Sequence, residues 1–204
     1  MALLDESAEF GRHALDVLRQ PLEEGVIRIA RAARTAVLPS RFLLAATRTP
    51  CPCGFHGDPQ RECRCTPPAI DRYHGRLSGP LRDRIDLSVW VPAVPYHALR
   101  DAGAGESSST VRARVVAARH RQHSRRGPRC RCWLNARLEG SALLQHSALT
   151  SEGLAVIDMA SRRFHLSTRS CHRVLRVART IADLAAVDRV PADDVREAVQ
   201  FRLV

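Results

Sequence analysis

The chain has 204 residues, a formal net charge of +11 and 45% hydrophobic residues, which fits one soluble globular domain or two small ones. This composition excludes disorder as the overall state. No stretch approaches the roughly 18 consecutive apolar residues of a membrane span. The acidic residues Asp5, Glu6 and Glu9 stand where a secretory signal needs basic and then apolar residues. We therefore expect a cytoplasmic protein that does not bind membranes.

All 32 basic side chains are arginine, and the chain contains no lysine. Reactions that need a lysine amine, such as Schiff-base chemistry or phosphate binding by a P-loop lysine, are therefore excluded within these residues. The surplus of guanidinium groups suits polyanions such as nucleic acid or nucleotide phosphates. A solvated surface enriched in arginine by coding bias is the alternative.

The first half of the chain begins with a short apolar pattern followed by a helical one. Leu3 and Leu4 predict the end of a buried strand that delivers Asp5 and Glu6 to its C-terminal edge. Apolar residues then recur at helical spacing over 8–22. An apolar strand that ends in adjacent acids suits an ATPase, because one carboxylate can hold Mg²⁺ and the other can polarise the attacking water. A surface turn is the alternative meaning of such a short pattern.

Apolar residues at 26–29 and 37–38 flank a basic segment and predict a β-hairpin. This hairpin places Arg28 on a strand and Arg31 and Arg34 near its tip. Further strands are predicted at 42–46 and 85–91. Between them lie a Pro- and Gly-rich cysteine loop over 51–65 and, over 70–81, a helix followed by a turn at 78–80.

The second half of the chain is predicted to be all helical. Gly and Ser residues over 96–110 indicate a linker and a domain boundary. Helical patterns follow at 111–126, 141–148, 151–163, 167–186 and 191–201. The whole pattern indicates an α/β domain followed by a helical one.

Three blocks of sequence resemble consecutive parts of the YifB/ComM family, the magnesium-chelatase-like AAA+ ATPases. They are LLDESAEFGRHALDVLRQPLEEGVIRIARAARTAVLPSRFLLAA, PCPCGFHGDPQRECRCTPPAIDRYHGRLSGPLRDRIDLSVWVP and LSTRSCHRVLRVARTIADLA. The most specific parts are CPCGFHGDPQRECRC and RLSGPLRDRIDL. The resemblance implies the C-terminal half of a AAA+ P-loop ATPase core over 1–96, a linker over 97–110 and a helical lid of the magnesium-chelatase C-terminal type over 111–204.

The same resemblance implies roles for individual residues. Asp5 and Glu6 fall on the Walker B acids that serve ATP and Mg²⁺. Arg84 falls on the arginine finger, which reaches ATP on a neighbouring subunit, and its alternative is an ion pair with a nearby aspartate. Arg169 falls on the sensor 2 position, and its alternative is a solvated arginine in a first helical turn.

Two departures from the family pattern bear on catalysis. Thr49 stands where the family usually has the sensor 1 asparagine that orients the attacking water, and a hydroxyl lacks the amide's paired donor and acceptor groups. We expect this change to weaken hydrolysis. The chain also contains no Walker A motif G-x-x-x-x-G-K-[ST], so we expect poor affinity for nucleotides.

The seven cysteines include three Cys-x-Cys pairs, which in a cytosolic chain favour metal binding or free thiols over disulfides. Four of them, Cys51, Cys53, Cys63 and Cys65, can supply thiolates to a tetrahedral structural Zn²⁺. His56 is a substitute ligand, and a metal-free loop of reduced thiols is the alternative. The resemblance predicts no metal for the third pair, at 130 and 132.

Two basic features bear on nucleic acid. The resemblance implies that the hairpin with Arg28, Arg31 and Arg34 points into the central pore of a hexameric ring. The segment 112–131 holds eight arginines in 20 residues. Phosphate contacts would make DNA binding sensitive to salt and independent of sequence, and a solvated helix face is the alternative for the second segment.

Two functions follow from these features. The first is a AAA+ ATPase subunit, a homo-oligomer that binds ATP and remodels DNA, as in branch migration. The alternative is a non-catalytic, basic, zinc-containing remnant that binds DNA or an intact ATPase partner. Insertion of magnesium into a porphyrin ranks last, because no residue pattern here recognises a tetrapyrrole.

Overall fold

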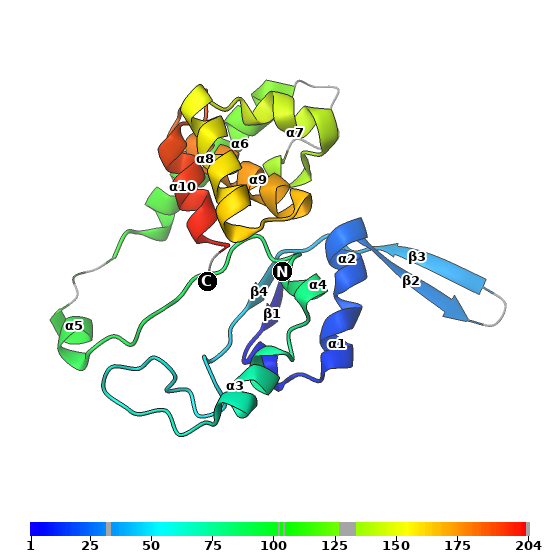
Figure 1. Cartoon of the computed structure of the whole chain (residues 1–204). Helices are drawn as coiled ribbons and strands as arrows, with labels where there is room; N and C mark the ends of the chain where they lie inside the picture. The colour runs from blue at the N-terminus through cyan, green and yellow to red at the C-terminus, as the bar shows by residue number, and fades with distance from the viewer. Residues whose placement is uncertain (32–33, 102, 104, 127–133, 203–204) are drawn as a thin grey trace. The chain divides into compact units, whose positions relative to one another are not determined.

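The computed structural model describes residues 1–31, 34–101, 103, 105–126 and 134–202 (Figure 1). Its contacts divide the chain into an N-terminal unit, Met1–Ile85, and a C-terminal unit, Asp86–Val204. This division falls ahead of the predicted linker at 97–110, because Asp86 forms an ion pair with Arg173 and the Ser88 N–H donates to the carbonyl of Phe201 at 3.0 Å. The predicted linker itself contains the helix α5, Tyr96–Asp101, and the start of the next helix.

The N-terminal unit mixes short strands with short helices, as the sequence predicts. Its elements are β1 (Ala2–Leu4), η1 (Ser7–Glu9), α1 (Arg12–Val17), α2 (Arg19–Glu24), β2 (Val26–Arg31), β3 (Arg34–Pro39), β4 (Leu44–Ala46), α3 (Pro67–His74) and α4 (Gly79–Arg82). The helix expected over 8–22 is divided at Leu18. Pro21 has no N–H to donate to the carbonyl of Val17, so one helical hydrogen bond is missing at that point.

Two small sheets organise this unit. Strands β1 and β4 pair in parallel, with Leu4 opposite Ala46 in the register. Strands β2 and β3 form the predicted antiparallel hairpin, in which Arg31 pairs with Arg34. All six residues of β3 are exposed, and Figure 1 shows the hairpin extending beyond α2. A hairpin with so little burial derives little stability from packing.

The strand predicted at 85–91 is wrong. The structure has no regular secondary structure over these residues, although apolar and polar side chains alternate there. Leu87, Val89 and Val91 are exposed. A strand needs a neighbour for its backbone hydrogen bonds, and the described part of the chain supplies none at this position.

The regular secondary structure in the described residues of the C-terminal unit is helical, apart from an isolated parallel bridge between Leu149 and Val190. Its helices after α5 are α6 (Ser108–Arg126), η2 (Asn135–Arg137), α7 (Gly140–Ser147), α8 (Ser151–Phe164), α9 (Thr168–Leu184) and α10 (Ala192–Gln200). These confirm the five predicted helices, with ends shifted by up to three residues.

Helix α9 is the centre of this unit and packs against α6, α7 and α10. Its buried stripe, which includes Val174, Leu175, Ala178 and Ala182, joins a continuous apolar core with residues of the neighbouring helices. The helix begins at a proper cap, because the Ser167 hydroxyl accepts the Ser170 N–H at 3.1 Å. Burial of this core supplies the main favourable term for the unit.

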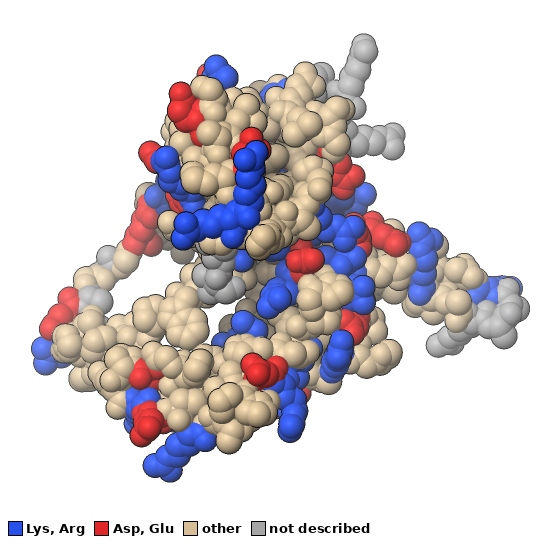
Figure 2. Space-filling model, viewed as in Figure 1, with Lys and Arg blue, Asp and Glu red and all other residues tan. Residues whose placement is uncertain are grey.

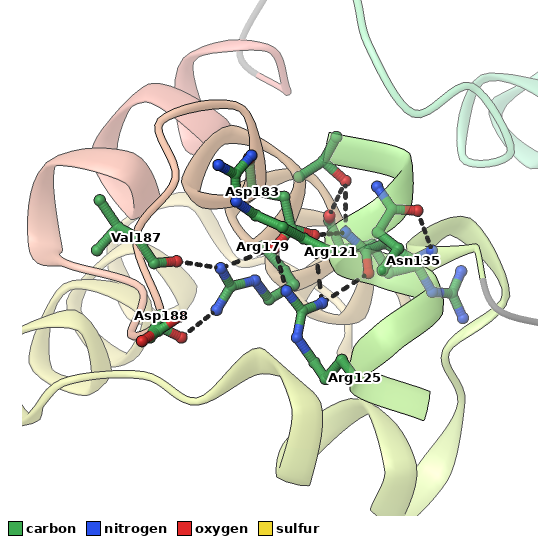
Figure 3. A network of polar contacts seen from close by, with 10 residues as sticks. Arg121, Arg125, Asn135, Arg179, Asp183, Val187 and Asp188 are labelled. Carbon is green, nitrogen blue, oxygen red and sulfur yellow. Dashed lines mark hydrogen bonds and ion pairs between the residues drawn. The ribbon is translucent and has the colours of Figure 1, made fainter. Parts of the chain in front are cut away.

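A buried ionic network lies beside the core (Figure 3). Asp183 and Arg179 are both fully buried and form an ion pair at 2.9 Å. Arg125 also pairs with Asp183, and the amide of Asn135 donates to the same carboxylate at 2.7 Å. Burial lowers the pKa of Arg179, and the charge of Asp183 opposes that shift. The guanidinium of Arg179 also donates to the carbonyls of Val187 and Asp188.

Among the described residues, every helix is too short or too polar to cross a bilayer.

Candidate functional site

The two acids predicted to serve a nucleotide lie in the turn after β1, and a threonine from the end of β4 contacts both. The Thr47 hydroxyl donates to Asp5 Oδ1 at 2.5 Å and accepts the backbone N–H of Glu6 at 3.0 Å. The parallel register explains this arrangement, because Leu4 lies opposite Ala46 and the next residues of both strands leave the sheet at the same edge. We call Asp5, Glu6 and Thr47 the acidic turn.

Glu6 has a left-handed backbone conformation, with φ of 48° and ψ of 51°. This conformation is unfavourable for any residue that has a Cβ atom, because Cβ lies too close to the following carbonyl oxygen. The Ser7 N–H donates to the Thr47 carbonyl at 2.7 Å, and the Thr47 N–H donates to the Leu4 carbonyl at 2.9 Å. These backbone bonds hold the turn in place on either side of the strained residue.

Thr49, predicted to stand in the sensor 1 position, faces away from the two acids. Its hydroxyl lies 2.6 Å from the hydroxyl of Tyr73 and donates to the carbonyl of Cys51 at 3.2 Å. The structure therefore places Thr47, and not Thr49, beside Asp5. The side chain of Thr49 belongs to the cysteine loop and its contact with α3.

Arg84, predicted to be an arginine finger, is held within the N-terminal unit. Its guanidinium forms an ion pair with Glu23 of α2 and donates to the Pro80 carbonyl at 2.6 Å. The side chain is 10% exposed. This ion pair joins Arg84 to a residue that lies 61 positions away in the sequence.

Arg169, predicted to be the sensor 2 residue, is the second residue of α9 in the C-terminal unit and is exposed. It thus lies in the first turn of α9, where the sequence places it. A guanidinium at a helix N-terminus is unfavourable to the helix dipole and favours an anionic neighbour.

The four predicted metal ligands come together in the cysteine loop. Their sulfur atoms all lie within 4.8 Å of one another. The Sγ atoms of Cys51, Cys53 and Cys63 are separated by 3.4 to 3.7 Å. Four thiolates at about 2.3 Å from a tetrahedral Zn²⁺ lie about 3.8 Å from each other, so the sulfur positions fit this ion. His56 is not a member of the group found among the described residues.

Tight turns bring these cysteines together. The Gly54 N–H donates to the Cys51 carbonyl at 3.0 Å, and Gly54 has a φ of 83° that glycine adopts without strain. Backbone N–H groups of Phe55 and Arg64, followed by neighbouring thiols, lower the pKa of Cys53 to about 6. Burial and the neighbouring thiols raise the pKa of Cys65 to about 12. Such opposed shifts arise when several thiols compete to be the thiolate.

The predicted nucleic-acid residues lie on the hairpin. Arg28 is exposed and bonds Glu24 at 3.2 Å, and Arg34 is exposed at the start of β3. Arg31 is the last residue of β2. In the register Arg28 lies opposite Val37, and Arg31 pairs with Arg34. Figure 2 shows basic side chains along this hairpin.

The arginine-rich segment 112–131 is only partly an open basic surface. Residues 127–131 lie outside the described residues, as do the cysteines at 130 and 132. On α6, Arg121 donates to the Asp183 carbonyl and Arg125 pairs with the Asp183 carboxylate. Arg112 and Arg119 are exposed. At least two of the eight arginines therefore serve the buried network.

Sequence reasoning missed Thr47, Tyr73 and Glu23, each of which contacts a predicted site residue. A strand register would have identified Thr47, since it follows β4 by one residue as Asp5 follows β1. Tyr73 and Glu23 act across 24 and 61 residues of sequence, and no local pattern indicates such pairs.

Comparison with known proteins agrees with these observations. Residues 1–99 match the family described as magnesium chelatase, subunit ChlI, and residues 105–202 match the family described as magnesium chelatase, subunit ChlI C-terminal. The chain is 40% identical over 202 residues to the uncharacterized protein YifB of Salmonella typhimurium. It is 39% identical over 200 residues to the competence protein ComM of Haemophilus influenzae and 41% identical over 199 residues to an uncharacterized protein of Mycobacterium tuberculosis.

These three alignments cover 98% of this chain and 38 to 39% of each relative. The chain thus spans about two fifths of the length of these curated relatives. Both family models and all three relatives point to the same group, and together they match nearly every residue. The chain belongs to the YifB/ComM family of magnesium-chelatase-like proteins.

Proposed function

We propose that this chain forms the Walker B half of a AAA+ P-loop ATPase core together with its helical lid, within a protein that uses ATP to remodel DNA. The observation that carries this proposal is the acidic turn. The Asp5 carboxylate and the Thr47 hydroxyl meet at the carboxyl edge of a parallel strand pair, with Glu6 next in the chain, and this edge is where α/β proteins bind their ligands.

The acidic turn fits a magnesium ion and a water molecule. Asp5 and Thr47 offer the oxygen ligands that Mg²⁺ prefers, and they already lie in contact through the 2.5 Å hydrogen bond. Bound magnesium neutralises charge on the nucleotide phosphates. Asp5 holds that ion, and the adjacent Glu6 accepts a hydrogen bond from the attacking water and orients it. Since the 204 residues include no lysine, the phosphate-binding lysine comes from another segment or chain.

Two arginines complete the proposed ATPase. Arg84 serves as the arginine finger for a neighbouring subunit of a ring, once it exchanges Glu23 for the phosphates. Arg169 contacts the phosphates from the lid as the sensor 2 residue. Homo-oligomerisation follows from these roles, because an arginine finger acts on nucleotide that another subunit holds.

The cysteine cluster is proposed to hold a structural Zn²⁺. The donor set supports this assignment, since four thiols within 4.8 Å of one another, three of them 3.4 to 3.7 Å apart, match a closed tetrahedral site. The loop over 51–65 has no regular secondary structure to order it. Zinc thus provides the cross-link that a hydrophobic core would otherwise provide.

ATP turnover by the purified chain, with and without duplex DNA, tests the ATPase proposal. We expect slow turnover at high MgATP concentration that falls about 100-fold or more in Glu6→Gln, because the residue that orients the water is lost. Glu106→Gln is the control, since Glu106 is an exposed carboxylate that pairs with Arg114. If neither ATP binding nor turnover occurs in the presence of DNA, the ATPase proposal is contradicted.

A second candidate is a non-catalytic, zinc-containing module that binds DNA or an intact ATPase partner. The exposed hairpin with Arg28, Arg31 and Arg34 favours it, because phosphate contacts need no nucleotide. Fluorescence anisotropy with duplex DNA at increasing salt is the test. Replacing Arg28 and Arg34 by alanine is expected to lower the salt slope by about 2. Arg196→Ala on α10 is the control, and an unchanged slope in the hairpin variant would remove the hairpin from DNA binding.

A further inference from the structure

The helix α3 is joined rigidly to the cysteine cluster. Cys65 is followed by Thr66, which has an extended backbone, and then by Pro67 and Pro68 in the first turn of α3. Proline rings fix the φ angle, so the direction in which α3 leaves Cys65 has little freedom. The position of Cys65 therefore restricts where this eight-residue helix can lie.

The far end of α3 returns to the other side of the same loop. Tyr73 is 5% exposed, and its hydroxyl lies 2.6 Å from Thr49 Oγ1. Thr49 has one hydroxyl hydrogen, which it donates to the Cys51 carbonyl, so Tyr73 is the donor to Thr49. Cys51, whose sulfur belongs to the cluster, is fully buried. The chain from Cys51 to Tyr73 is thereby closed into a ring by the sulfur cluster and by this hydrogen bond.

A second contact ties this ring to the acidic turn. Arg76 follows α3, and its guanidinium donates to the Ala8 carbonyl at 2.6 Å and to Glu9 at 3.2 Å. The same guanidinium lies 5.6 Å from the centre of the Tyr73 ring. Ala8 and Glu9 belong to η1, which begins directly after Glu6. Tyr73 thus lies between the cysteine loop and η1, the short helix that follows Glu6 of the acidic turn.

Thr47 and Thr49 both lie in the irregular segment that follows β4. A shift of Thr49 moves Thr47 with it, because two peptide units separate them, and Thr47 bonds both Asp5 and Glu6. We infer that Tyr73 is a positioning residue, which couples occupancy of the cysteine cluster by zinc to the geometry of the acidic turn through Thr49. The inference rests on the proposed zinc centre and deepens it: the metal orders the two acids as well as its own loop.

Hydrogen exchange of the whole chain tests this coupling. The reporters are the N–H groups of Glu6, Ser7 and Thr47, which all bond across the acidic turn. Zinc content is measured in every sample. Relative to zinc-loaded wild type, we expect about tenfold faster exchange at these amides in chelated wild type and in zinc-loaded Tyr73→Phe, the loss expected for one hydrogen bond.

Matched variants separate positioning from general damage. Tyr96→Phe removes the hydroxyl of a tyrosine that is 79% exposed on α5, and we expect wild-type exchange. Thr49→Ser keeps the bridging hydroxyl and is expected to retain protection, whereas Thr49→Val loses it. Zinc-loaded Tyr73→Phe with wild-type protection of the acidic turn would overturn the coupling and leave the zinc centre intact. Wild-type protein that takes up no zinc would contradict the centre itself, and the coupling with it.

Discussion

The two units of this chain are stabilised in different ways. The C-terminal unit has a continuous core of thirteen buried apolar residues among those described, whereas the described part of the N-terminal unit buries five, including Cys51 and Tyr73. The N-terminal unit instead relies on hydrogen bonds across the acidic turn, on the ion pair of Arg84 with Glu23, and on the cysteine cluster.

This difference shows that one chain can combine a helical unit ordered by burial with a unit ordered by polar contacts and sulfur. Apolar burial is proportional to area and does not depend on a ligand. A thiolate cluster contributes to folding when it binds its metal. We therefore expect the two units to respond to different perturbations, and the following predictions use this to test the comparison.

Metal removal has the largest expected effect and is confined to the N-terminal unit. Structural zinc contributes on the order of 10 kcal/mol in small zinc domains, which exceeds what the five buried residues can replace. Calorimetry should show two unfolding transitions, of which chelation or Cys51→Ser abolishes one. Cys171→Ser, on α9, serves as the control and should keep both. Two unchanged transitions after chelation would contradict the claim that the N-terminal unit depends on metal.

Asp183→Ala is the next largest perturbation and is confined to the C-terminal unit. It leaves the buried charge of Arg179 without its ion pair, which costs about 3–5 kcal/mol in the free energy of unfolding. Urea unfolding followed by far-ultraviolet circular dichroism measures the loss. Asp193→Ala removes an exposed carboxylate from a pair with Arg196 and should cost less than about 1 kcal/mol. If the two variants lost the same free energy of unfolding, the buried network would stabilise the unit no more than an exposed ion pair does.

The smallest expected effect concerns Asp194 in the first turn of α10. Burial, followed by the charge of Glu197, raises the pKa of Asp194 from its usual 3.8, and Arg179 opposes the shift. The folded state thus binds the proton more tightly than the unfolded state, and stability falls as the pH rises from 3.8 through the folded pKa. The Asp194→Asn variant has no carboxyl group at this position, so its stability does not fall in this way as the pH rises.

The difference in urea midpoint between Asp194→Asn and wild type should therefore grow from acidic to neutral pH. Asp193→Asn is the matched control from the same helical turn. A difference that stays constant with pH would show that the proton is bound equally in both states.

Local patterns predicted most of the helices and the hairpin, because helical stripes and short alternating strands are properties of neighbouring residues. The strand predicted at 85–91 shows where such patterns fail: alternation of Leu87, Val89 and Val91 indicates a strand only if another strand lies beside it. The cysteine cluster was predictable because two Cys-x-Cys pairs in one Gly-rich loop leave few other arrangements.

The contacts of the candidate site were harder to predict than its members. Asp5 and Glu6 are recognisable as a pair, but their partner Thr47 follows from the register of β1 and β4. The contacts of the arginines on α6 were equally hard to predict from the sequence. A surface interpretation suits Arg121 and Arg125 by composition, and only the position of Asp183 reveals that they serve a buried network.

The left-handed backbone of Glu6 has a consequence for engineering. Glycine adopts this conformation freely, whereas glutamate gives up about 1 kcal/mol or more to do so. Selection of variants for heat resistance alone would therefore favour Glu6→Gly, which discards the carboxylate proposed to orient water. Any directed evolution of this chain for stability thus needs a screen for activity alongside it, since one accessible gain in stability lies at the residue proposed for its chemistry.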